Sequence, residues 1–200
     1  MAEETYQYGN WGPAFYGPVP ATPSAYIGAD RLWHVPKSAD VTVERLHQNV
    51  TTAGLAANTG EQNLHTFILS AGKLANAGDT VRIRAWVKCA ATANNKAVKV
   101  YFGGTVIGSS TGQTFNNVGF DIEAHVFRVT RTAQKAVCVA VQPNIDAAWS
   151  IATGGGLNAS TPAEDLSGAV TINIAGISSV AGAANDIQVL ATVIDYITAV

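Results

Sequence analysis

The feature that most constrains the fold is a strict two-residue alternation over residues 81 to 89. Apolar side chains occupy every second position of this run, and the positions between them carry cations or tryptophan. Successive side chains of a β-strand point to opposite faces, so the pattern predicts a half-buried strand. Its predicted inner face is Val81, Ile83, Ala85, Val87 and Cys89, and its outer face is Arg82, Arg84, Trp86 and Lys88.

Comparable runs recur at short spacing through the rest of the chain, and none has the helical period over ten residues. Consecutive glycines at Gly103-Gly104 predict a hairpin with a type I′ turn, because glycine tolerates a positive φ. A slip of phase near Phe127 to Val129 predicts a β-bulge. We therefore predict an all-β fold, a jelly-roll β-sandwich of about eight antiparallel strands over residues 61–200. The expected strands are 64–70, 79–89, 96–102, 105–107, 118–130, 134–142, 168–176 and 187–197.

The first 60 residues have a different composition and predict an extended N-terminal arm. Residues 1–36 hold five of the seven prolines and seven of the sixteen aromatic residues. Prolines at this density exclude a helix and disfavour a central strand, because each removes a backbone donor and fixes φ. Residues 40–48 permit either a short strand or a helical turn.

Aromatic rings in the arm require a surface to cover them, since each large ring left in water forgoes roughly 1.5–3 kcal/mol of burial. The arm either folds back and completes the core of its own domain, or it docks on neighbouring subunits or a larger shell. The predicted protein-interaction residues are Tyr6, Tyr8, Trp11, Phe15, Tyr16 and Tyr26.

The last strand predicts an oligomer interface, because both of its faces are apolar. Continuous alternation puts Ile187, Val189 and Val193 on one face, and Leu190, Ile194 and Tyr196 on the other. A strand that is apolar on both sides is covered twice, once by the opposing sheet and once from outside. We predict that Leu190, Ile194 and Tyr196 contact another subunit.

Charge and hydropathy exclude several classes of function. Only 13% of the residues are charged and the net charge is −2, which predicts neither nucleic-acid nor anionic-membrane binding. No Lys or Arg precedes Arg31 and no run of eighteen apolar residues occurs, so we expect neither a secretory signal nor a spanning helix. Cys89 and Cys138 are expected to be buried, reduced thiols.

Catalytic and metal-ligand spacings are also missing from the sequence, so we predict a non-enzymatic protein without cofactors or metals. His34, His47, His65 and His125 are scattered and fit packing better than metal binding. Asp121 and Glu123 share a strand face with His125, which leaves a sandwich hydrolase as a weak alternative. We interpret these three residues as a solvated face.

One stretch resembles a known family. It comprises residues 78–86 (GDTVRIRAW), 93–96 (ANNK) and 98–104 (VKVYFGG), and it is similar to a segment of tailed-bacteriophage virion proteins. Decoration and tail-appendage modules of this kind look like trimeric jelly rolls. Lys88 departs from the pattern, in which a glycine often follows the strand.

The resemblance implies a virion structural protein made in the host cytoplasm. We expect a capsid decoration, or cement, protein that stabilises the assembled shell as a homotrimer. Its expected partners are further copies of itself and the major capsid protein or other virion proteins. The alternative is a tail-fibre or tail-tip module that binds host carbohydrate through Trp86 or Trp149.

Overall fold

The computed structural model describes residues 26–27, 33–34, 41–57, 60–110, 112–141, 158–179 and 184–199. The chain divides into two compact units, Met1–Asp40 and Val41–Val200. In the first unit, β1 (Tyr26–Ile27) and β2 (Trp33–His34) pair antiparallel. The remaining predicted arm residues, Tyr6, Tyr8, Trp11, Phe15 and Tyr16, lie outside the described residues, as does Trp149.

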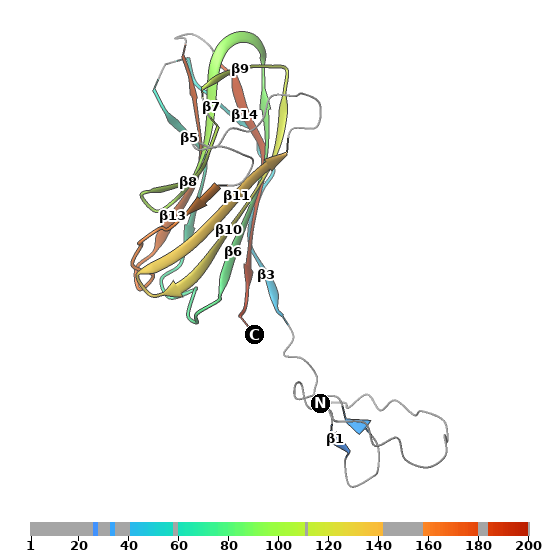
Figure 1. Cartoon of the computed structure of the whole chain (residues 1–200). Helices are drawn as coiled ribbons and strands as arrows, with labels where there is room; N and C mark the ends of the chain where they lie inside the picture. The colour runs from blue at the N-terminus through green and yellow to red at the C-terminus, as the bar shows by residue number, and fades with distance from the viewer. Residues whose placement is uncertain are drawn as a thin grey trace, which may run out of the picture. The chain divides into compact units, whose positions relative to one another are not determined.

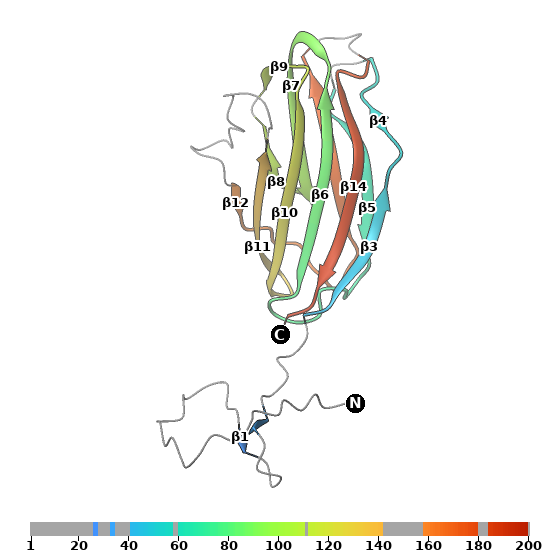
Figure 2. The ribbon, with the colours of Figure 1, turned by 90° about the vertical axis from the view of Figure 1, so that its right-hand side faces the viewer.

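The second unit is a β-sandwich, which confirms the predicted all-β fold (Figures 1 and 2). A seven-stranded sheet has the order β12-β11-β10-β6-β14-β3, with β4 also paired to β14. A five-stranded sheet has the order β5-β13-β7-β8, with β9 also paired to β7. The long strands are β3 (Val43–Asn49), β5 (Gln62–Leu69), β6 (Thr80–Cys89), β7 (Ala91–Phe102), β10 (Gly119–Thr130), β11 (Ala133–Val141), β13 (Val170–Ser178) and β14 (Ile187–Ile197). The short ones are β4 (Ala53–Gly54), β8 (Thr105–Ser109), β9 (Gln113–Asn116) and β12 (Asn158–Ser160).

The core lies between the two sheets and follows the alternation of the sequence. All five apolar side chains predicted to face inward from β6 are at most 1% exposed. They pack against residues of the other sheet such as Val100, Phe102 and Ile172. Cys89 and Cys138 are buried, free thiols, and burial raises the pKa of each to about 12. Both cysteines therefore act as small core residues.

The predicted arm of residues 1–60 includes two strands of the sandwich, so its boundary lies too late in the chain. β3 pairs with β14 over six residues, and β4 pairs with the start of β14. Within β3, only Leu46, His47 and Asn49 are even partly buried. An edge strand that buries so little needs no clear alternation of apolar and polar residues. The sequence of residues 40–48 is therefore compatible with both a short strand and a helical turn.

Two local predictions are tested by the backbone. The hairpin between β7 and β8 is confirmed, but only Gly103 of its two glycines has a positive φ, 59°. The turn is therefore not type I′, which needs positive φ at both positions. The predicted bulge is confirmed as a shift of register between Arg128 and Thr130 where β10 pairs with β11.

Candidate functional site

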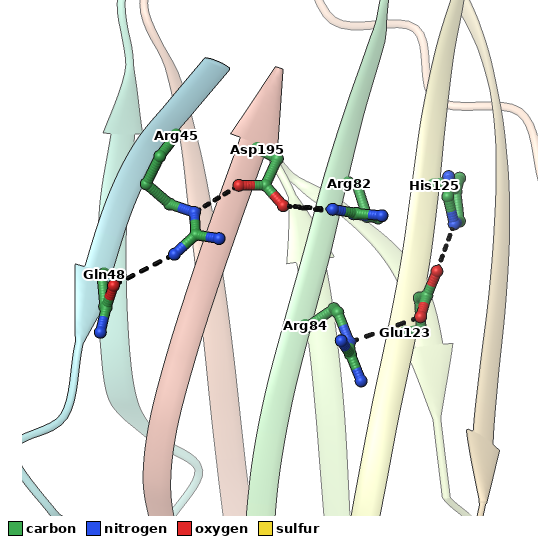
Figure 3. A network of polar contacts seen from close by, with 7 residues as sticks. All are labelled: Arg45, Gln48, Arg82, Arg84, Glu123, His125 and Asp195. Atoms are coloured by element: carbon green, nitrogen blue, oxygen red, sulfur yellow. Dashed lines mark hydrogen bonds and ion pairs between the residues drawn. The ribbon is translucent and has the colours of Figure 1, made fainter. Parts of the chain in front are cut away.

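The seven-stranded sheet exposes a polar and aromatic face. We use the term "outer face" for the side of this sheet that points away from the five-stranded sheet. Strand alternation and cross-strand register align the side chains on this face in rows, as Figure 3 shows for two of them. The outer face comprises Arg45 and Gln48 of β3; Ala191, Val193 and Asp195 of β14; Arg82, Arg84, Trp86 and Lys88 of β6; Asp121, Glu123, His125 and Phe127 of β10; and Lys135, Val137 and Val139 of β11.

The first row is centred on Asp195, whose side chain is only 2% exposed. Arg82 Nη2 donates to Asp195 Oδ2 at 2.6 Å, and Arg45 contacts the other carboxylate oxygen from β3. Burial alone would raise the pKa of Asp195, but the hydrogen bonds and positive charges of the two arginines lower it overall. One carboxylate thus joins three neighbouring strands.

The second row is centred on Arg84. Its Nη2 lies 3.3 Å from Asp121 Oδ2, and its Nε lies 3.4 Å from Glu123 Oε2. Glu123 Oε1 is 2.7 Å from His125 Nε2. Both carboxylates of the hydrolase alternative are therefore paired with the same guanidinium, an arrangement suited to neutralising charge on a surface.

Trp86 follows Arg84 on the same face and is partly buried. The Arg84 guanidinium carbon lies 5.1 Å from the Trp86 ring centroid, within the range of a cation–π contact. The cross-strand neighbours of Trp86 are Asp121 and the small Ala191. Asp121 Oδ1 is buried and has no hydrogen-bond partner among the described residues. The partly exposed indole and the Asp121 carboxylate, whose side chain is 42% exposed, together form a place where a hydroxylated ligand can be recognised.

A second polar cluster, mostly buried, lies at the end of the sandwich where β7 pairs with β9. Lys96 is 0% exposed, and its ammonium donates to the carbonyl oxygens of Thr92, Asn94 and Phe115 at 2.9–3.1 Å. Asp186 accepts from the side chains of Thr92, Asn94 and Ser178. Burial would raise the pKa of Asp186, but these hydrogen bonds and the Lys96 charge lower it. These contacts join β7 to the segments around Phe115 and Asp186, so the cluster holds this end of the fold together.

Two of the histidines, His65 and His47, have packing roles. His65 is buried, with Nδ1 2.7 Å from Thr192 Oγ1 and Nε2 2.8 Å from the Thr51 carbonyl oxygen. His47 stacks on Phe67 with ring centroids 5.0 Å apart. Within the described part of the chain, no three His, Cys, Asp or Glu side chains gather into a possible metal site. No described segment forms a helix of the length and apolarity needed to cross a membrane.

The interface predicted on the last strand needs correction. Leu190 is 39% exposed, but Ile194 and Tyr196 are 1% and 9% exposed and belong to the core. A shift of register between Val189 and Ala191 marks a bulge at Leu190, which moves the later residues by one position. Ile194 and Tyr196 therefore face the opposing sheet, and only Leu190 remains accessible to another subunit.

Comparisons with known proteins place few limits on function. No protein-family model matches the sequence, and no curated protein matches it significantly. Among solved structures, the chain is similar to the CBM2 module of the evolved Dit of Lactobacillus casei BL23 phage J-1. The similarity has a TM-score of 0.42 and 10% identity, and it covers 81% of this chain and 99% of that one. The outer face has to be interpreted from its own chemistry.

Proposed function

We propose that the chain is a non-enzymatic virion structural protein of a tailed bacteriophage. Its role would be that of a capsid decoration, or cement, protein that binds the assembled shell as a homotrimer. The resemblance over residues 78–104 supports this setting, and that segment forms β6, β7 and the turn after them. The low charged fraction of 13% supports surfaces that are buried between subunits.

The observation that carries the proposal is the division of the chain after Asp40. Within the described residues, the core of the sandwich is built from Leu55 to Tyr196, with contributions from both sheets. The sandwich thus has a core of its own within the part of the chain that the structure describes. This favours docking on neighbouring subunits or a shell over the alternative of a core completed by the arm.

Stabilisation would follow from mass action and needs no chemistry. A protein that binds only the assembled shell stabilises it by RT ln(1 + [L]/Kd). A trimer that engages three sites gains further affinity, because the second and third contacts form at high effective concentration.

The test is a pelleting assay with shells of the parent phage that lack this protein. We expect the full chain to pellet with the shells, and electron microscopy of labelled particles to place it on the capsid. Combined substitution of Trp11, Phe15 and Tyr16 by alanine should abolish pelleting, whereas the control Tyr101→Phe on the sandwich should not. Pelleting by the arm variant as by wild type, or labelling confined to the tail, would contradict the proposal.

A second candidate function is carbohydrate binding by a tail-tip module, and it is favoured by Trp86 on the outer face. The partly exposed indole offers an apolar surface, and Asp121 beside it offers a hydrogen-bond acceptor, the combination found in small-molecule sites. Glycan-array binding by the full chain should disappear with Trp86→Ala. It should persist with Phe127→Ala, which removes an aromatic ring that stacks on His125 elsewhere on the same face.

A further inference from the structure

Lys88 differs from the three arginines of the outer face in having no acidic partner within the part of the chain that the structure describes. Arg45 and Arg82 share Asp195, and Arg84 pairs with Asp121 and Glu123. Lys88 is exposed, and no ion pair or hydrogen bond of its side chain is found within the described residues. Its cross-strand neighbours are Gly119 on β10 and Gln188 on β14. The charge of this ammonium is therefore not neutralised by the sheet.

Lys88 and Trp86 are two residues apart on one strand, so their side chains are neighbours on the same face. Each of them has one small cross-strand neighbour. Ala191 lies opposite Trp86, Gly119 lies opposite Lys88, and among the described residues a Cβ added at Gly119 would touch only the Val87 carbonyl oxygen, at 3.7 Å. On these sides, neither neighbour is long enough to cover the indole or the ammonium.

The balance of charge on the outer face points to an anionic ligand. The face carries five cationic side chains against three acidic ones, a net charge of +2, although the whole chain has a net charge of −2. Charge complementarity increases the rate of encounter with an anion and selects against cationic ligands.

We infer that Trp86 and Lys88 form a subsite for an acidic sugar, an anionic pyranose unit of a polysaccharide. The pyranose ring stacks on the indole, its carboxylate or sulfate group pairs with the Lys88 ammonium, and a ring hydroxyl donates to the Asp121 carboxylate, whose side chain is 42% exposed. This inference rests on the second candidate function and names its ligand class.

The experiment is affinity electrophoresis of the full chain in gels that contain polygalacturonate, hyaluronate or dextran sulfate, with neutral dextran and fully methyl-esterified polygalacturonate for comparison. We expect retardation by at least one acidic polymer that exceeds retardation by the neutral ones and weakens with added salt. Lys88→Gln should lower the affinity for the acidic polymer about fivefold, the size of one exposed ion pair. Trp86→Ala should abolish binding altogether.

Lys135→Gln is the matched control. Lys135 is exposed on the same face but lies opposite Phe127, away from Trp86, so its substitution should leave binding unchanged. If neutral polymers bind equally well and Lys88→Gln has no effect, the acidic subsite is wrong while the carbohydrate function stands. If none of the polymers binds, both are overturned. Equal retardation by single-stranded DNA would show a general polyanion surface and reject the sugar.

Discussion

Arg82 of β6 donates to Asp195 of β14 at 2.6 Å, although the two residues are 113 positions apart in the sequence. Arg45 of β3 contacts the same carboxylate from the other side. The Asp195 side chain is 2% exposed, so its charge depends on these two partners, because a buried carboxylate without compensation is strongly destabilising.

The first prediction concerns the pH dependence contributed by Asp195. Its pKa in the folded protein lies below the ordinary value of 3.8. The ionised group therefore stabilises the fold fully above the unfolded-state pKa, and this contribution is lost as the pH falls through the lowered folded-state pKa. Urea unfolding from pH 6 downwards should show wild type losing more stability below pH 3.8 than Asp195→Asn. Equal losses would contradict the prediction.

The buried ammonium of Lys96 leads to a second prediction. Lys96→Met should destabilise the sandwich by about 3–5 kcal/mol, because three carbonyl oxygens, that of the buried Phe115 among them, lose the ammonium that donates to them. Chemical denaturation measures this difference. Lys99→Met is the control, since Lys99 pairs with Glu61 where both side chains are 31% exposed, and such pairs contribute about 1 kcal/mol or less. A similar loss of unfolding free energy in both variants would show that the Lys96 cluster contributes no more to stability than the exposed ion pair.

The third prediction separates the two faces of β14. Ile194→Asp should unfold the sandwich, because it places a charge without a partner in the core. Leu190→Asp should leave the free energy of unfolding within about 0.5 kcal/mol and shift sedimentation velocity towards monomer, as expected if Leu190 lies in an interface. An unchanged sedimentation coefficient for Leu190→Asp would remove Leu190 from the proposed interface.

A fourth prediction concerns the contact between the two sheets at Gly108. A Cβ added there would lie 2.4 Å from Cys138 Sγ, so Gly108→Ala should destabilise the fold by about 1–3 kcal/mol through overpacking. Cys138→Ala removes that sulfur, and the double variant should therefore lose less stability than the two single losses added together. Gly112→Ala, which meets no atom within 4 Å, is the control. Additive losses would show that Gly108 and Cys138 do not interact.

The alternation of β6 shows what local sequence can predict. Side chains of a strand alternate whatever lies around it, so Val81 to Cys89 could be assigned to the core, and Arg82, Arg84, Trp86 and Lys88 to the other face, before any partner strand was known. The hairpin glycines and the bulge near Phe127 are also local signals. β3 had no such signal, because an edge strand that buries little shows no preference between its faces.

The carbohydrate candidate was only partly visible in the sequence. Trp86 could be selected as a ring on the outward face of its strand, but its neighbours Asp121 and Ala191 come from strands that lie far away along the chain. The lack of a partner for Lys88 likewise depends on which residues the register places opposite it. The net charge of the whole chain is −2, so the sequence alone does not reveal that the outer face is positive.

By itself, the sequence determined the all-β class, the two faces of the central strand and the separate composition of the N-terminal segment, because these follow from residue type and short-range spacing. Only the tertiary structure decided that Ile194 and Tyr196 lie inside, because a bulge at Leu190 changes the phase of β14. It also decided that Asp195 joins Arg45 and Arg82. Both outcomes depend on the register between strands, which is set by long-range pairing and core packing.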